Sequence, residues 1–164
     1  MAVDMFLKID TVDGETIDKV FSKDKAIDVL AWSWGGSNSG TTHQGGGGGG
    51  GKSNFQDMSI TKYLDTASPV LLMACADGTH FTKAKLTVRK AGGKAPVEYF
   101  KIEMDEVLIT SLSTGGSGGE DRLTENVSLN FAKFSVYYTP QAPDGTAGTE
   151  IGPNTWDISA NATA

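Results

Sequence analysis

Apolar and polar residues alternate most regularly over residues 97–138, where two long runs predict a pair of antiparallel strands. In the first run, Phe100, Ile102 and Met104 occupy every second position. Their neighbours Tyr99 and Lys101 lie on the opposite side of the predicted strand. This period is typical of a strand that buries one face, and the two runs form the longest predicted hairpin of the chain.

The second run changes its parity partway along. Its apolar residues stand at odd positions up to Phe131 and at even positions from Phe134 onwards. One extra residue is needed to keep both halves on the same face of a sheet. The pattern therefore predicts a β-bulge near Ala132–Lys133, of the kind found in strongly bent sheets and barrels.

Two glycine-rich segments predict loops. Residues 111–126, SLSTGGSGGEDRLTEN, join the long runs without any apolar period, and their four glycines tolerate positive φ values. Residues 36–52 include seven consecutive glycines, Gly45 to Gly51. Fixing seven backbones costs on the order of 7–14 kcal/mol, so we expect this second loop to be mobile unless a partner orders it.

Shorter strand-like runs occur at residues 3–9, 27–35, 54–63, 80–90 and 156–161. The Asp- and Lys-rich residues 15–26 predict a loop, and residues 139–154 predict a second Pro- and Gly-rich loop. Many strands and a single helix predict one mainly β domain over residues 1–164. From the pattern alone, this domain is an antiparallel β-barrel or a two-sheet sandwich with one short flanking helix.

The helix is predicted after residue 67. Ser68 is placed to cap its first N–H groups, Pro69 suits the first helical position, and Gly78 is placed to end it. Leu71, Leu72 and Cys75 share one face of this helix and are expected to lie on the sheet. We interpret Cys75 as a small buried apolar residue, because no neighbouring base activates its thiol.

The run 27–35, IDVLAWSWG, has two apolar faces of different bulk. Leu30, Trp32 and Trp34 form the bulky face and are expected to fill the core. The small-residue face suits close approach to a lumen or a partner, and its members are Val29, Ala31 and Ser33. The alternative is an ordinary central strand that is covered on both sides within the domain.

Composition narrows the possible functions. At 164 residues, folding buries roughly 70% of the surface of the unfolded chain, which is enough for one self-sufficient core. A net charge of −6 disfavours binding to nucleic acid or to an anionic membrane surface. One cysteine permits no intrachain disulfide. The N-terminus lacks the pattern of a signal peptide, and no apolar run approaches the ~20 residues that span a bilayer.

Candidate catalytic and binding motifs are weak. Residues 46–53 match the phosphate-loop pattern, but a strand follows them where a helix is required, so we expect no nucleotide site. His43 and His80 stand far apart, and the sequence predicts no metal site and no cofactor. Three acidic residues of the 111–126 loop, Glu120, Asp121 and Glu125, are reminiscent of a glycosidase pair. With Arg122 among them, we interpret all four as exposed charges or interface contacts and expect no enzyme.

Several segments together resemble the Hcp family, the tube protein of the type VI secretion system. The resembling segments are, in chain order, MAVDMFLKI, IDVLAWSWG, FQDMSITKYLD, LLMACADGTHF, AKLTVRKAGG, VEYFKIEMDEVLITS and STGGSGGEDRLTENVSLNFA. The likeness extends over about 130 residues and is weaker at residues 15–26, in the polyglycine segment and beyond Pro140.

The resemblance implies a compact β-barrel that assembles as a homohexameric ring with a wide pore. Rings stack into a tube that a contractile sheath expels, a VgrG-type spike caps it, and effectors bind in the pore. Val29, Ala31 and Ser33 are then candidates to line the pore. Candidates for contacts within or between rings are Lys52, Glu120, Asp121, Arg122 and Glu125. The protein would be cytoplasmic before export and would be secreted without a cleaved signal peptide.

A second hypothesis is a small β-sandwich binding module for carbohydrate or a surface ligand. Such modules present aromatic platforms, and Trp32, Trp34 or Trp156 could supply one. A binding module is expected to be monomeric or dimeric, whereas a tube protein is expected at about six times the chain mass.

Overall fold

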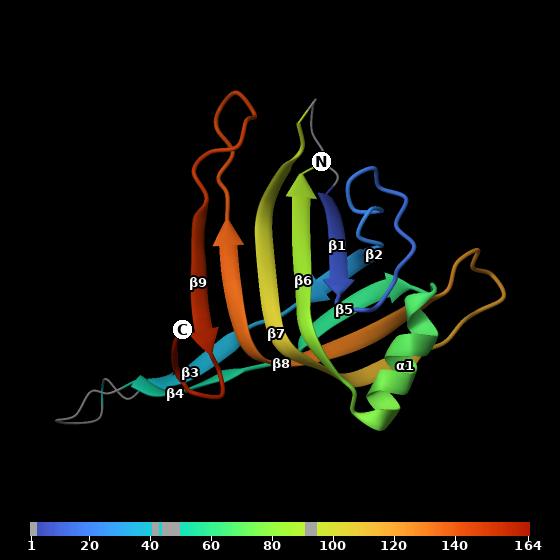
Figure 1. The fold of residues 1–164 in the computed structure, drawn as a ribbon, viewed down its shortest axis with the longest axis horizontal. Helices are drawn as coiled ribbons and strands as arrows, with labels where there is room; N and C mark the ends of the chain where they lie inside the picture. Colours follow the sequence, from blue (N-terminus) through green and yellow to red (C-terminus); the bar gives the residue numbers. More distant parts are fainter. Residues whose placement is uncertain (1–2, 41–42, 44–49, 91–94) are drawn as a thin grey trace.

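A computed structural model describes residues 3–40, 43, 50–90 and 95–164 of the chain (Figure 1). The strands in the first half are β1 (Val3–Ile9), β2 (Ile27–Ser33), β3 (Gly36–Gly40), β4 (Gly50–Phe55) and β5 (Met58–Tyr63). Helix α1 (Ala67–Asp77) follows them. The second half contains β6 (His80–Lys90), β7 (Val97–Thr114), β8 (Thr124–Tyr138), β9 (Ile151–Asp157) and β10 (Ala162–Thr163).

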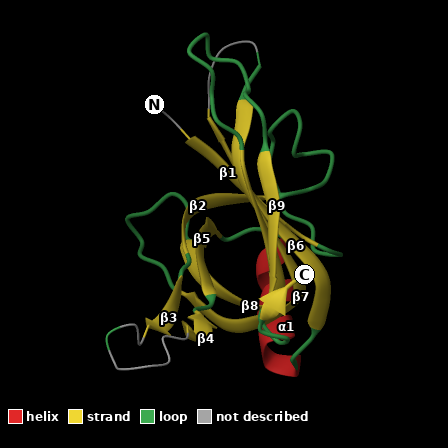
Figure 2. Cartoon of the chain, turned by 90° about the vertical axis from the view of Figure 1, so that its left-hand side faces the viewer, coloured by secondary structure: helices red, strands yellow, loops and turns green. Residues whose placement is uncertain are grey.

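Six antiparallel strands close into a barrel in the order β8-β5-β2-β1-β6-β7, and β7 pairs again with β8. Strands β9 and β10 extend the sheet from β8, and β3 and β4 form a separate two-stranded hairpin. Figure 2 shows β2, β5 and β8 curving around the barrel, with α1 beside it. The prediction of a mainly β barrel with one flanking helix is confirmed.

The core lies inside the barrel. Side chains that alternate inward from six strands are fully buried there, among them Leu7, Ile9, Ile27, Met58, Ile60, Leu86, Ile102, Met104 and Leu129. Each aliphatic side chain of this size contributes about 1.5–3 kcal/mol by leaving water. Closure also removes the unpaired edges that an open sheet of these strands would expose.

Strands β6, β7 and β8 bend together at one level, which Figure 1 shows as a sharp turn of the three ribbons. The predicted parity change in β8 is present, since Phe131 and Phe134 are both buried. The expected slip in pairing is absent, because Asp105↔Lys133 and Val107↔Phe131 keep one register. The prediction of a one-strand bulge is therefore wrong at this point.

The reason is that β7 changes its parity at the same level as β8. Buried side chains pass from Met104 to Val107 in β7, and Glu106 between them has a φ of 54°. β6 changes from Phe81 to Ala84 in the same way. With one extra residue in each of three paired strands, the sheet folds over without losing its ladder.

Helix α1 starts earlier than expected and buries a different face. Its N-cap is Thr66, and the carboxylate of Asp65 accepts the N–H of Ala67 at 3.0 Å, so Ser68 is not the cap. Gly78 ends the helix with a φ of 72°, as predicted. The face on the barrel consists of Ala67, Leu71 and Ala74. Leu72 is exposed and Cys75 is only partly buried, because this face follows positions i, i+4 and i+7.

Three predicted loops contain strand residues. β7 runs to Thr114 and β8 begins at Thr124, so the predicted loop over 111–126 is shorter at both ends. Residues 36–40 and 50–52 belong to the β3–β4 hairpin, so the predicted loop over 36–52 is corrected at both ends. Residues 41–42 and 44–49 lie outside the described residues, and the mobility of the segment stays a prediction. The last long strand is β9, which begins at Ile151 inside the segment predicted as a Pro- and Gly-rich loop.

Candidate functional site

Strand β2 changes the face that it turns to the core partway along. Its pairing with β5 shifts register between Val29 and Ala31. Before the shift Val29 is buried at 6% exposure, whereas Leu30 is 39% exposed. After the shift Trp32 packs against the core while Ala31 and Ser33 are exposed. Two expectations are corrected: Val29 is a core residue and cannot line a pore, and Leu30 is not in the core.

Ala31 and Ser33 belong to a broader surface that crosses four strands. Two rows of directly paired residues run through β2, β5, β8 and β7: Ala31, Thr61, Asn126 and Ser113, and beside them Ser33, Ser59, Ser128 and Ser111. We call these eight residues the polar face. The row between them, Trp32, Ile60, Val127 and Leu112, points to the opposite side of the sheet, toward the core.

The polar face carries only small side chains and no charge, although 21% of the chain is charged. Its members are exposed or half-buried. Two hydrogen bonds link neighbouring strands: Thr61 donates to Asn126 at 2.8 Å, and Ser111 donates to Ser128 at 2.8 Å. Such cross-strand pairs stabilise the sheet. The surface can therefore offer hydroxyl and amide groups to a partner without attracting a charged one.

Two of these eight residues, Ala31 and Ser33, are predicted from the sequence, and the other six are not. A signal was present: the outward positions at the end of β7 and in the first half of β8, and the first two in β5, are Ser, Thr or Asn, whereas Lys101, Glu103 and Asp105 of β7 are charged. Strand alternation identifies polar positions, but only pairing register places the neutral ones side by side.

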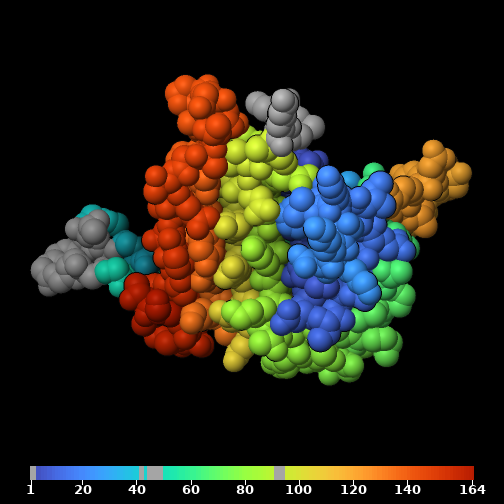
Figure 3. Space-filling view, turned by 45° about the horizontal axis from the view of Figure 1, so that its top comes forward, coloured from blue at the N-terminus to red at the C-terminus, as the bar shows by residue number. Residues whose placement is uncertain are grey.

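The candidate contact residues are divided among three places. Lys52 is exposed on β4, and Glu120, Asp121 and Arg122 are exposed in the loop 115–123 between β7 and β8. Figures 1 and 3 show the β3–β4 hairpin and this loop projecting from opposite sides of the molecule. The guanidinium carbon of Arg122 lies 3.8 Å from the ring centroid of Tyr63, which anchors the end of the loop.

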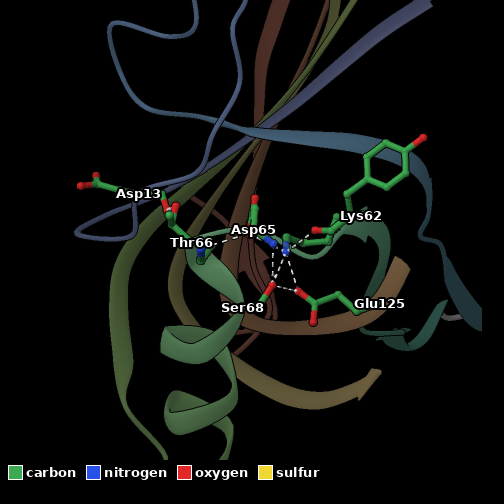
Figure 4. A network of polar contacts seen from close by, with 8 residues as sticks. Asp13, Lys62, Asp65, Thr66, Ser68 and Glu125 are labelled. Carbon is green, nitrogen blue, oxygen red and sulfur yellow. Dashed lines mark hydrogen bonds and ion pairs between the residues drawn. The ribbon is translucent and has the colours of Figure 1, made fainter. Parts of the chain in front are cut away.

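Glu125 is not an exposed contact residue. It shares the parity of Val127 and is buried at 2% exposure, with Oε1 at 2.5 Å from Nζ of Lys62 (Figure 4). Ser68 donates to the same carboxylate oxygen at 2.6 Å, and Asp65 lies 2.9 Å from the ammonium of Lys62. The charge of Glu125 is thus compensated inside the molecule.

The weak motifs gain no support. Lys52 and Ser53 lie in β4 and no helix follows them, as expected for a chance phosphate-loop match. Across residues 3–40, 43, 50–90 and 95–164, no three His, Cys, Asp or Glu side chains gather to hold a metal. In the same ranges no helix is long and apolar enough to cross a membrane.

Comparisons with known proteins converge on one family. The family model described as "Type VI secretion system effector, Hcp" matches residues 6–138. Protein hcp1 of Pseudomonas aeruginosa strain PAO1 is 57% identical over 164 residues, which is the full length of both chains. Among solved structures, a type six secretion system protein superposes with a TM-score of 0.91 at 31% identity, covering 99% of this chain and 100% of that one. Hcp1 from Salmonella typhimurium gives 0.78 at 33% identity with full coverage of both.

Proposed function

The chain belongs to the Hcp family of type VI secretion proteins, and on this premise we propose that it is the structural subunit of a type VI secretion tube. Six copies close into a ring, rings stack into a tube, and a contractile sheath expels the tube. A VgrG-type spike caps the tube, and secreted effectors bind inside the pore. The proposal assigns the protein no catalytic role and no cofactor.

The polar face is the observation that carries this proposal, because it suits the wall of a pore. A ring of six repeats every wall residue six times, so one charged position would concentrate six like charges around the lumen. Ala31 and Ser33 remain candidates for pore lining, and Ser59, Thr61, Asn126 and Ser128 join them on the same face. A neutral wall of hydroxyl and amide groups allows cargo to pass or to dock through hydrogen bonds.

The two projecting elements support stacking. The β3–β4 hairpin carries Lys52 on one side of the molecule, and the loop 115–123 carries Glu120 and Asp121 on the other. Opposite charges at opposite ends suit a heterologous contact, in which one end of a subunit meets the other end of the next. A contact of this kind repeats without limit along a tube.

The family also suggests where the protein acts. We expect it in the cytoplasm before the sheath contracts and outside the cell afterwards, with no signal peptide removed. Intact-mass measurement of extracellular material tests this directly. Nucleic acid is not among the expected partners, because a net charge of −6 disfavours it.

The assembly is tested by light scattering coupled to size exclusion. We expect a particle of about six times the 17.2 kDa chain mass, and negative-stain electron micrographs with sixfold rings. Measurement across salt concentrations matters because ring closure brings six chains of charge −6 together. A monomer at every salt concentration would rule out the tube proposal.

The binding-module hypothesis receives less support from the tryptophans. Trp34 is surrounded by Phe55, Phe131 and Phe134, with ring centroids at 4.8–5.7 Å. Trp32 stacks on Phe100 at 5.8 Å. Rings that pack against one another in this way fill a core and do not form an open platform for a sugar.

A further inference from the structure

Lys62 occupies a core position in the barrel. Met58, Ile60 and Lys62 share the inward side of β5, and each is paired directly with a buried residue of β8: Leu129, Val127 and Glu125. Two apolar pairs are thus followed by an ion pair in the same row. Ion pairs at such positions often add little stability compared with an apolar pair of similar volume. Stability alone therefore does not explain why an ion pair occupies this position.

Lys62 links three elements: β5, to which it belongs, β8 and α1. Its ammonium lies within 3.1 Å of four oxygens, from Glu125 of β8, Asp65, Ser68 of α1 and the carbonyl of Tyr63. One cation faces two carboxylates, and the positive end of α1, which begins at Ala67, lies beside the excess negative charge. We call Lys62, Asp65, Ser68 and Glu125 the Lys62 network.

The network lies directly beneath the loop 115–123. Glu125 is the second residue of β8 after that loop, and the adjoining residues make two further contacts. The N–H of Leu64 donates to the carbonyl of Leu123 at 3.0 Å, and Arg122 lies over the ring of Tyr63. The C-terminal stem of the loop is therefore attached, residue by residue, to the turn between β5 and α1.

We propose that the Lys62 network is a positioning device, which fixes the direction in which the loop 115–123 leaves the barrel. This inference rests on the proposed function, in which the same loop carries the acidic residues that meet the next ring. Hydrogen bonds from one ammonium to three elements fix a direction that apolar packing leaves free. Lys62 and Glu125 then act on stacking without touching the neighbouring ring.

Glu125→Gln tests the positioning step in the isolated protein. The amide keeps the shape of the side chain but removes the charge that Lys62 and Ser68 contact. Hydrogen exchange followed by mass spectrometry should show faster exchange, by about tenfold, at the end of the loop: at residues 123–126 and at Leu64, whose N–H donates to the carbonyl of Leu123. The remaining barrel strands should be unchanged. Glu15→Gln, at an exposed carboxylate outside the network, is the matched control and should leave the loop unchanged. Unchanged loop exchange in Glu125→Gln would overturn the inference.

A second variant separates positioning from stability and remains informative if Glu125→Gln does not fold. The double substitution Lys62→Met with Glu125→Leu extends the apolar rows of β5 and β8 by one pair. We expect its melting temperature to be no lower than that of Glu125→Gln, with loop exchange still accelerated. Loop exchange as slow as in the native chain would show that packing alone positions the loop.

Tube length in electron micrographs then connects the network to stacking. Glu125→Gln should form normal rings but shorter stacks. Glu120→Gln with Asp121→Asn tests the stacking role itself, since both side chains are exposed on the loop. If that variant stacks as well as the native chain, the assignment of the loop to stacking fails. The exchange measurement on Glu125→Gln still decides the positioning step.

Discussion

Arg89 of β6 contacts Asp18, which lies 71 residues earlier in the chain, with Nη2 at 2.5 Å from Oδ2. The same guanidinium donates to Asp4 of β1 at 3.0 Å and lies over the rings of Phe6 and Phe21. The segment between β1 and β2 contains no strand but is fastened to the outside of the barrel at this point. The two phenylalanine rings stack at 4.1 Å beneath the guanidinium.

Asp18→Asn should therefore loosen this segment and destabilise the fold. The amide cannot form the charge-assisted hydrogen bonds, and the buried Arg89 side chain loses its principal partner. We expect the free energy of unfolding to fall by about 1–3 kcal/mol in urea titrations at pH 7. Asp24→Asn in the same segment is the control, and it should change little because Asp24 is exposed. Equal effects of the two substitutions would contradict the role of the Arg89 contact.

Acid should remove the same contribution in the native chain. Hydrogen bonding to Arg89 is the largest cause that lowers the pKa of Asp18, from 3.8 to about 2. A lowered carboxyl pKa stabilises the fold above the unfolded value, and this stabilisation is lost as the pH falls from 3.8 through about 2. Urea titrations between pH 5 and pH 2 should show the native chain losing about 1–2 kcal/mol more than Asp18→Asn. Parallel pH curves for the two proteins would disprove this.

Glu106 tests the bend of the three long strands. Its φ of 54° is costly for a residue with a β-carbon but not for glycine. We expect Glu106→Gly to leave stability unchanged or to raise it by up to about 1 kcal/mol, and Glu106→Val to lower it by about 1–2 kcal/mol. Lys85→Gly, at an exposed position in the regularly paired part of β6, is the control and should destabilise by roughly 0.5–1 kcal/mol. Equal destabilisation by the two glycines would show that Glu106 does not need this backbone.

The parity of β8 shows what periodicity can and cannot reveal. The change between Phe131 and Phe134 is visible in the sequence, and it correctly marks the place where the sheet bends. The matching change at Glu106 is harder to detect, because one charged residue follows another there and no apolar residue marks the extra position. A single strand therefore suggests a local bulge, whereas the paired strands form a common bend.

For similar reasons, only part of the candidate site could be predicted from the sequence. Ser33 was predicted correctly as outward-facing, but Val29 was not, because an irregularity near Leu30 changes the parity of β2 without a sequence signal such as glycine. For Glu125, its place beside Arg122 in a Gly-rich segment without apolar period predicts an exposed charge. Its partner Lys62 is 63 residues away, and only the pairing of β5 with β8 brings them together.

Ser33→Gln tests the assignment of the polar face to a pore. Ser33 is exposed and paired with Ser59, while the neighbouring Trp32 packs toward the core, so a longer side chain meets no packed atoms of its own chain. The melting temperature should change little, and rings should form normally. Six added side chains would narrow the lumen, so retention of pore-bound effectors in pull-downs should fall several-fold. Thr149→Gln, at an exposed position outside the polar face, should retain cargo normally. A large drop in the melting temperature or loss of rings would mean that Ser33 lies at a packed interface between protomers, because an inserted side chain is costly only where atoms already fill the space.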